Sequence, residues 1–483
     1  MTTTADAALA DAWMQLGGEP SAPARLTVSG PARTLASALP CTTAGIAAVG
    51  ASLLAATGPG TPVGLDTRQL AVAVRSERYL RRDGASPGSP FDPLSAFHRA
   101  ADRWIRLHAN YPWHRAAALR VLGCADDLDA VRRAIADWDA VELETALHDA
   151  GGVAAACRTE AEWAEGEAGY SAGDPGAPGQ DTPDHAHGRP AGAHARPGSA
   201  HARPSGAHTA ADLPLVERRD LAPAPPRRPA GSLRVLDLTR VIAGPVATRT
   251  LAVHGADVLR VDPSDRPEIA LQAWDMLPGK RSALADLADR DTREELLRGA
   301  DVVVTGYRPG ALDRFGLAPE ALAQRHPGLT VVTLSAWGHR GPWAGRRGFD
   351  SLVQVACGIA VREAGPGWTG ETPPGALPAQ LLDHATGYLI AAGTLRAVAD
   401  QRERGGTPHV RLSLLGTAQW LLGLPPETGP DPGEVDPDPY LQEIDAPDGR
   451  LTLAIPPGSV GGHPLRWGPP PPSFGTAAAA WPS

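Results

Sequence analysis

The second half of the chain alternates short apolar runs with helical patterns, and this alternation restricts the possible folds more than any other feature. The runs are rich in Val, Leu and Thr and cover 233–238, 257–262, 301–305 and 329–335. Segments with a helical period lie between them, at 246–255, 292–299 and 319–326. Strands that alternate with helices form βαβ units, and the resulting parallel sheet is covered on both faces. The sequence therefore predicts an α/β fold with a Rossmann-like parallel sheet.

The turn after the first run contains no phosphate-binding glycine fingerprint. It reads TRVIAGPVA (239–247), without the GxGxxG spacing that lets a backbone approach a pyrophosphate. NAD is therefore disfavoured as a cofactor. A GxSxG elbow and an HExxH motif are also missing, which gives a serine hydrolase or a zinc enzyme little support.

Composition and charge indicate a soluble cytoplasmic protein. The formal net charge is −9, so neither nucleic acid nor an anionic membrane is expected as the main partner. No apolar run approaches the roughly 20 residues that span a bilayer, and the first residues lack a signal-peptide pattern. The four cysteines are scattered without a CxxC pair, which is typical of reduced thiols and predicts no metal centre.

Composition divides the chain into four parts. The predicted parts are a folded region at 1–165, a disordered Gly/Ala/Pro/His linker at 166–231, a catalytic domain at 232–422, and a proline-rich return segment with a poorly ordered tail at 423–483. Five linker histidines could bind a transition metal, or the tract is simply solvated; they are His185, His187, His194, His201 and His208. Of the 45 Lys and Arg residues, only Lys280 is a lysine, and it lies in PGKRS.

Five blocks of the second half, taken in order, resemble the family III CoA-transferases, the group of the formyl-CoA and carnitine-CoA transferases. The blocks are LRVLDLTRVIAGPVATRTLAVHGADVLRVD (233–262), PGKRSALADL (278–287), DVVVTGYRPGALDRFGL (301–317), SAWGHRGPWAGRRGFDSLVQ (335–354) and PAQLLDHATGYLIAAGTLRAV (378–398). The resemblance implies that family's fold, with a smaller α+β domain beside the sheet. It also implies transfer of CoA from an acyl-CoA to a carboxylic acid, with no metal.

The resemblance assigns the nucleophile to Asp383. This residue starts a long helical pattern, where a carboxylate feels the positive end of the helix dipole. Taken alone, an aspartate at this position is more often a structural N-cap or first-turn residue, and the register of the four upstream blocks is what favours the nucleophile. In the family, the carboxylate attacks the thioester, and the reaction proceeds through an anhydride and an aspartyl-CoA thioester. His384, directly after it, is predicted to be a pocket-wall or surface residue.

The resemblance also implies which residues contact CoA. They are Arg240, Ile242, Ala243, Ala285, Asp286, Ala288, Gly306, Tyr307, Arg308, Arg314, Arg347 and Phe349. Each arginine alone could be a solvated surface charge, whereas together at one sheet edge they favour a phosphate site. Two positions depart from the family pattern: Gly306 replaces a common asparagine, and Pro263 replaces a common basic residue. The family's glycine-rich lid has no clear counterpart.

The first 165 residues resemble part of the same family a second time. The segment 42–72 is similar to the segment that begins at His384, and 101–115 with 137–163 are similar to the family's small domain. Family members form interlocked dimers, so we expect a partial copy fused ahead of a catalytic copy as an internal pseudo-dimer, with further homodimerisation left open. Asp383 aligns near Cys41, where no carboxylate lies, which predicts one working site. Alternatively, two related fragments dock only for stability.

Two alternative functions use the same fold. An α-methylacyl-CoA racemase removes an α-proton with a His/Asp pair, but Phe349 stands where the family's histidine lies. A non-catalytic protein that binds CoA esters is the second alternative. Asp383 argues against it, whereas Gly306 and Pro263 favour it.

Overall fold

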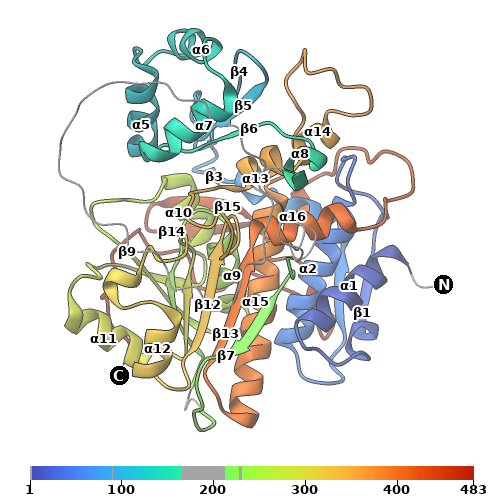
Figure 1. The fold of residues 1–483 in the computed structure, drawn as a ribbon. Coiled ribbons are helices and arrows are strands. Elements are labelled where there is room, and N and C mark those ends of the chain that lie inside the picture. Colours follow the sequence, from blue (N-terminus) through green and yellow to red (C-terminus); the bar gives the residue numbers. More distant parts are fainter. Residues whose placement is uncertain (1–2, 90, 166–212, 228–230, 483) are drawn as a thin grey trace, which may run out of the picture.

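A seven-stranded sheet forms the centre of the computed structural model, which describes residues 3–89, 91–165, 213–227 and 231–482 (Figure 1). The strand order is β10-β9-β8-β11-β12-β13-β7. The first six strands are parallel, and β7 runs antiparallel to β13. The strands are β7 (Glu217–Asp220), β8 (Arg234–Leu238), β9 (Asp257–Asp262), β10 (Lys280–Leu284), β11 (Val302–Thr305), β12 (Thr330–Ser335) and β13 (Pro408–Ser413).

The predicted α/β architecture is confirmed. The four apolar runs form β8, β9, β11 and β12, and the three helical patterns form α9 (Ala243–Val253), α11 (Arg290–Gly299) and α12 (Pro319–Arg325). The chain builds β9 and β10 on one side of β8 and β11 to β13 on the other. The order of the sheet therefore reverses between β8 and β11, where open α/β sheets bind ligands at the carboxyl ends of their strands.

The predicted linker is wrong at its C-terminal end. Residues 213–227 are placed, and their strand β7 extends the sheet by pairing Arg218 with Val410. Leu215 and Val216 are buried in the main core, which gives this segment the apolar contacts that a disordered linker lacks. Residues 166–212 and 228–230, with the five linker histidines, lie outside the described residues.

Helices cover the two faces of the sheet. On one face, α9 and α15 (Leu381–Arg404) pack over Val304, Val332 and Val410. On the other face, α11 and α12 cover Val303 and Val331. The connection from β12 to α15 contains α13 (Asp350–Ala356) and α14 (Ile359–Glu363), and α16 (Leu414–Gly423) follows β13. Residues that alternate along each strand thus belong to two separate cores.

The start of the chain packs against α15 and does not form a core of its own. Helix α2 (Cys41–Ala56) is buried along most of its length between α1 (Thr4–Gln15) and α15 (Figure 1). It leads into the short strand β2, helix α3 and helix α4. These and neighbouring elements are η1 (Ala22–Arg25), β1 (Leu26–Ser29), β2 (Val63–Asp66), α3 (Thr67–Ala73), α4 (Ser76–Tyr79) and β3 (Arg81–Arg82).

Residues 94–156 form a smaller α+β unit with a separate core, at the top of Figure 1. Its antiparallel sheet has the order β4-β5-β6, and three helices pack on one face. The elements are β4 (Phe97–Arg99), β5 (Trp104–Leu107), α5 (Pro112–Leu122), α6 (Leu128–Ala136), α7 (Ala140–Asp149) and β6 (Ala154–Ala156), followed by α8 (Glu160–Glu165). Ile105 and Leu107 point into this core, so Arg106 and His108 face the large sheet domain.

The end of the chain returns to the N-terminal part, and the prediction of a poorly ordered tail is wrong. Its strands pair with β2 and β3; they are β14 (Leu441–Ala446), β15 (Gly449–Ala454), β16 (Ser459–Val460) and β17 (His463–Pro464). The tail then runs along the edge strand β10: Ala477 N–H donates to the Ser282 carbonyl (2.7 Å), and the Trp481 indole donates to the Leu296 carbonyl (2.8 Å). These contacts cover an otherwise open sheet edge.

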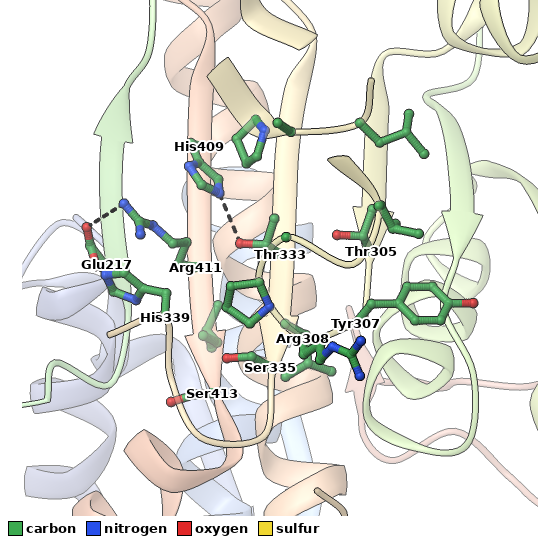
Figure 2. Close-up of a pocket in the computed structure, with 18 of the residues that line it drawn as sticks. Glu217, Thr305, Tyr307, Arg308, Thr333, Ser335, His339, His409, Arg411 and Ser413 are labelled. Atoms are coloured by element: carbon green, nitrogen blue, oxygen red, sulfur yellow. Dashed lines mark hydrogen bonds and ion pairs between the residues drawn. The ribbon is translucent and has the colours of Figure 1, made fainter. Parts of the chain in front are cut away.

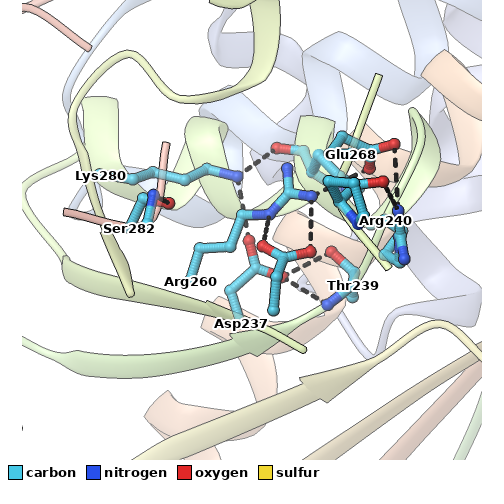
Figure 3. Close-up of polar contacts among 12 residues, drawn as sticks. Asp237, Thr239, Arg240, Arg260, Glu268, Lys280 and Ser282 are labelled. Carbon is cyan, nitrogen blue, oxygen red and sulfur yellow. Dashed lines mark hydrogen bonds and ion pairs between the residues drawn. The ribbon is translucent and has the colours of Figure 1, made fainter. Parts of the chain in front are cut away.

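A buried ionic network joins β8, β9, β10 and α9 (Figure 3). The Lys280 ammonium donates to Asp237 Oδ2 (3.0 Å), Thr248 Oγ1 (2.5 Å) and the Pro245 carbonyl (3.0 Å). Burial lowers the pKa of Lys280 to about 8, while Asp237 opposes that shift, so the amine is charged at neutral pH. On β9, Arg260 extends the network through ion pairs with Asp262 (2.7 Å) and Glu268 (2.9 Å). The chain's one lysine is therefore a structural cation.

We expect Lys280→Met to lower the free energy of unfolding by about 3–5 kcal/mol, because Asp237 would remain buried without its cation. Denaturant unfolding followed by tryptophan fluorescence measures the change. The matched control is Arg450→Met, whose ion pair with Asp445 is exposed (59% and 82% of the side chains) and should contribute less than about 1 kcal/mol. Equal losses in the two variants would contradict the role given to Lys280.

Candidate functional site

Asp383 lies in the first turn of α15 and faces a small, partly open cavity. The residue is 7% exposed, and the cavity measures about 30 Å³, enough for a few atoms. The lining residues come from the N-terminal part, the turn after β8 and the segments around α13 and α15. They are Glu77, Phe91, His108, Asn110, Val241, Ile242, Gln272, Phe349, Ser351, Gln380 and Asp383.

The carboxylate of Asp383 does not cap the helix. The N-cap of α15 is Gln380, which forms no side-chain capping bond, and the Asp383 side chain accepts no hydrogen bond from a described residue. Burial raises the pKa of Asp383 well above its ordinary value, and the nearby Asp350 and Glu77 carboxylates raise it further. A buried acid without hydrogen-bond donors is costly to ionise, which is typical of a reactive group and untypical of a structural one.

Asp350 is the residue that holds Asp383 in place. It begins α13, is fully buried, and its Oδ2 accepts the backbone N–H of Asp383 (3.1 Å). Its other oxygen accepts from the Gln354 amide. Burial raises the pKa of Asp350 to about 6, although these donors lower it. Two carboxyl groups thus lie at the start of α15, and each disfavours ionisation of the other.

His384 was predicted to be a pocket-wall or surface residue, and the structure excludes the surface position. It is fully buried, with its Nε2 3.6 Å from Glu77 Oε2, and it is not part of the cavity lining. Successive residues of a helix point in different directions, so Asp383 enters the cavity while His384 packs against α4.

The N-terminal part completes the cavity from the opposite side. The His108 ring stacks on the Phe349 ring with centroids 3.6 Å apart. Burial and then the charges of His114 and Arg106 hold the pKa of His108 well below its ordinary value, so the ring is neutral. Asn110 accepts hydrogen bonds from the Asp92 N–H (2.9 Å) and the Ser95 hydroxyl (2.6 Å), which fix its side chain.

The turn after β8 is strained where it meets the cavity. Val241 has φ +68°, a conformation that a β-branched residue rarely adopts. Its N–H donates to Glu268 Oε2 (3.0 Å), and Thr239 before it is fixed by Asp237, whose Oδ1 accepts the Thr239 N–H (2.9 Å). The buried network therefore sets the position of a residue in the cavity wall.

All predicted CoA contacts lie at or beyond the carboxyl edge of the parallel sheet. Ile242 and Phe349 line the cavity with Asp383, whereas Tyr307 and Arg308 line a second cavity. Ala243, Gly306, Arg314 and Arg347 line neither cavity. After β10, three of the predicted contacts also lie outside both cavities: Ala285, Asp286 and Ala288.

Arg240 is already engaged within the protein. Its guanidinium donates to the carbonyls of Arg266 and Pro267 (2.8 Å each) and lies 3.6 Å from Glu268. It also packs over the Tyr111 ring at 5.2 Å. These contacts use Arg240 to hold the 266–268 loop beside the cavity.

Three other arginines form a positive cluster without a buried counter-charge. Burial lowers the pKa of Arg347, and Arg308 and Arg266 lower it further. Neither Arg308 nor Arg347 forms an ion pair with a described carboxylate, and Arg266 has only the exposed Asp265 at 3.9 Å. Burial and then Arg347 also lower the pKa of His114 to about 4. Such a cluster suits a phosphate group.

The sequence did not point to several of the residues around Asp383. Asp350 directly follows Phe349 in a recognised block, so its position was a usable signal. Glu77, His108 and Asn110 lie more than 270 residues before Asp383, and no spacing links them to it. No group of three or more metal-ligating side chains occurs among the described residues. The placed helices also include none with the length and apolar character of a membrane span.

Comparison with known proteins places these residues in context. Residues 231–428 match the model of CoA-transferase family III. The chain is 35% identical over 209 residues to the acetyl-coenzyme A transferase of Hypoxylon pulicicidum (42% of this chain, 35% of that protein). It is 34% identical over 202 residues to a probable fatty acyl-CoA transferase of Mycobacterium tuberculosis (38% of this chain, 50% of that protein). A crystal structure of the mycobacterial protein superposes with a TM-score of 0.36 at 32% identity, covering 40% of this chain and 55% of that one.

The matched part of the chain thus spans 35% and 50% of the lengths of these two relatives. It contains Asp383, Asp350 and every predicted CoA contact, whereas Glu77, His108 and Asn110 lie outside it. The resemblance seen in the five sequence blocks is confirmed to this extent: residues 231–428, which contain all five blocks, match the model of CoA-transferase family III.

Proposed function

We propose that this chain transfers CoA from an acyl-CoA thioester to a carboxylic acid, with Asp383 as the nucleophile. The observation that carries the proposal is the Asp383 carboxylate itself, which is buried, faces a small cavity and accepts no hydrogen bond from a described residue. The match of residues 231–428 to the family supports the same reaction.

The reaction proceeds through three acyl species at Asp383. The carboxylate attacks the thioester carbonyl, the C–S bond breaks, and CoA leaves as a thiolate. The thiolate attacks the aspartyl carbonyl of the mixed anhydride, which releases the donor acid and leaves an aspartyl-CoA thioester. The acceptor carboxylate repeats these steps in reverse and regenerates Asp383. The relay conserves the thioester energy, provided that water does not reach the anhydride.

The cavity supplies what these steps need. Its small volume excludes bulk water, and the side-chain amides of Gln272 and Gln380 are available as donors to a tetrahedral oxyanion. Acylation removes the charge of Asp383 and with it the repulsion from Asp350. The paired carboxyls therefore favour the covalent intermediates over the free, ionised enzyme.

The positive cluster of Arg266, Arg308 and Arg347 suits the phosphates of CoA. It lies at the carboxyl edge of the sheet, where the strand order reverses, and its cations have no buried counter-charge. From there a pantetheine arm would reach Asp383 past Ile242 and Phe349, which are already part of the cavity wall.

We further propose that one chain makes one complete site. Glu77, His108 and Asn110 reach the cavity of Asp383 from the N-terminal part. The order α2–β2–α3 repeats the order α15–β13–α16, and α2 packs beside α15, which supports a fused partial copy. The first residues of α2 are Cys41, Thr42 and Thr43, so this copy lacks a carboxylate nucleophile.

A second candidate function is proton exchange at the α-carbon of an acyl-CoA. Phe349 replaces the expected base, but the neutral His108 ring stacks on Phe349 and lines the cavity together with Asp383. A base and an acid thus face the same space, as a racemase requires.

Arg106 is a candidate for binding the acceptor acid. It lies on the face of β5 that carries His108, and its guanidinium lies 5.8 Å from the ring of Phe91, a lining residue. It forms no ion pair with a described carboxylate, its buried Nε has no partner, and burial lowers its pKa. A partly buried guanidinium without an ion pair favours a carboxylate ligand.

Incubation with a panel of acyl-CoAs and hydroxylamine, followed by peptide mass analysis, tests the relay. We expect an acyl-CoA-dependent hydroxamate on Asp383, and a kcat for Asp383→Asn lower by on the order of 10⁴- to 10⁶-fold, as for other catalytic nucleophiles. The exposed Asp445→Asn is the matched control and should keep the wild-type rate. Bound CoA esters without any hydroxamate would contradict the relay, and deuterium exchange at the α-carbon would favour the racemase.

The pH dependence tests the coupling between Asp350 and Asp383. The nucleophile must be ionised, so kcat/KM should fall as the pH drops through a pKa that lies above the ordinary aspartate value. Asp350→Asn removes a charge that raises this pKa and should move the acid limb of the profile down by on the order of one unit. A lower rate with an unmoved limb would indicate that Asp350 acts only through its hydrogen bond.

Steady-state kinetics of two Arg106 variants test acceptor binding. Arg106→Met should raise the KM for the acceptor acid roughly ten- to a hundredfold, the effect of losing a hydrogen bond to a charged group. The KM for the acyl-CoA should not change, and Arg106→Lys should restore part of the loss. An equal rise in both KM values would point to a structural role in the N-terminal unit.

A further inference from the structure

One face of the central sheet changes from apolar to polar along its strands. On the face covered by α11 and α12, Val303 of β11 and Val331 of β12 belong to the core. Further along the same face, towards the carboxyl ends, the side chains are polar; they are Thr305, Thr333, Ser335, His409 and Arg411. Helix α12, which covers this face, has only seven residues and does not extend over these polar positions, so helix packing does not explain them.

These polar residues form the floor of a cavity of about 250 Å³ (Figure 2). Strand β7 closes one side with Glu217 and Arg219, and the loop 307–313 with the start of α12 closes the other. Leu312 and Leu317 give the cavity an apolar wall. It shares no lining residue with the cavity of Asp383. Its volume lies just below the range of drug-sized ligand pockets, so it suits a small molecule.

The hydrogen bonds on the floor leave one hydroxyl proton free. The Arg219 Nε–H donates to Nδ1 of His409 (3.3 Å), so Nδ1 is the acceptor and the proton of the neutral ring lies on Nε2. Nε2 then donates to Thr333 Oγ1 (3.0 Å). The Thr333 hydroxyl cannot return its proton to that ring and has it available for a group in the cavity.

The ring of His409 stays neutral across the physiological pH range. Burial, followed by the nearby Arg411, Arg219 and His339, lowers its pKa to about 3. His339 is likewise neutral, since burial and Arg411 lower its pKa to about 4, although Glu217 opposes them. The tautomer that directs the Thr333 proton is therefore fixed.

Two of the three carboxylates of the lining are already paired. Glu217 Oε1 lies 3.1 Å from Arg411, its Oε2 lies 3.2 Å from His339, and Glu320 lies 2.6 Å from Arg219. The remaining carboxylate, Asp313, is exposed at the rim. Arg308 forms no ion pair with a described residue, and Ser335 Oγ has no hydrogen bond to one. The free groups of the interior are thus mostly donors.

We propose that this cavity is a second binding site, separate from Asp383, for a small organic oxyanion. The Thr333 and Ser335 hydroxyls would donate hydrogen bonds to a carboxylate or phosphate head group, and the wall of Leu312 and Leu317 would contact an apolar body. Cavities at the carboxyl ends of parallel strands commonly hold ligands. The site does not depend on the reaction proposed for Asp383.

Calorimetric titration of the full chain with two probes, citrate and inorganic phosphate, tests the site. Each probe is titrated in the presence of saturating CoA and, in a second experiment, into the Asp383→Asn variant. We expect at least one probe to bind in both settings, and the stronger probe identifies the head group. Thr333→Val should weaken that binding roughly tenfold, the effect of losing one hydrogen bond to a charged ligand. Thr333→Ser keeps the hydroxyl and should bind as the wild type does.

Loss of binding when CoA is added would overturn the proposal, because the nucleotide end of CoA would then be the occupant, reaching the cavity past Arg308. Absence of binding for both probes, or wild-type binding by Thr333→Val, would also overturn it. Should Thr333→Val fail to fold, Ser335→Ala provides the same comparison. Its hydroxyl lines the cavity without a hydrogen bond to a described residue, so its loss should weaken binding without disturbing the sheet.

Discussion

The buried ion pair between Lys280 and Asp237 is the interaction on which the rest of the arrangement depends. Lys280 comes from β10 and also binds the first turns of α9, so one ammonium fixes two strands and a helix relative to each other. The second oxygen of Asp237 holds Thr239 in the turn that leads to Val241. Because two charges without water are stable only when paired, the network permits one geometry for this corner of the sheet.

The same corner positions Asp383, the proposed nucleophile. Helix α15 crosses α9 at Gly387, where a Cβ atom would lie 2.6 Å from the Ala243 carbonyl, so only glycine allows the close approach. One turn earlier, Asp350 accepts the N–H of Asp383. The turn of α15 from Asp383 to Gly387 is thus fixed at one end by Asp350 and at the other by its contact with α9. The stability lost by burying neighbouring carboxyls is offset by the large core around them.

The regular elements of the large domain were predictable from the sequence, because burial on both faces requires apolar runs with a recognisable period. The predictions failed where stability comes from distant contacts. Strand β7 lies in a segment of low apolar content, and it forms because β13 offers an unpaired edge. The tail after β17 is held by backbone bonds to β10, a contact that proline content does not reveal. The positions of Glu77 and His108 in the cavity lining were not predicted for the same reason.

The sequence by itself determined the parallel sheet, the placement of the arginines at or beyond its carboxyl edge, and the position of Asp383 in the first turn of a helix, because these follow from local periodicity and strand direction. Only the tertiary structure decided which of these groups are free to react. It engaged Arg240 within the protein, left Arg308 unpaired, and buried Asp383 without a hydrogen-bond donor. The charge state and availability of a side chain depend on neighbours that the chain brings together only on folding.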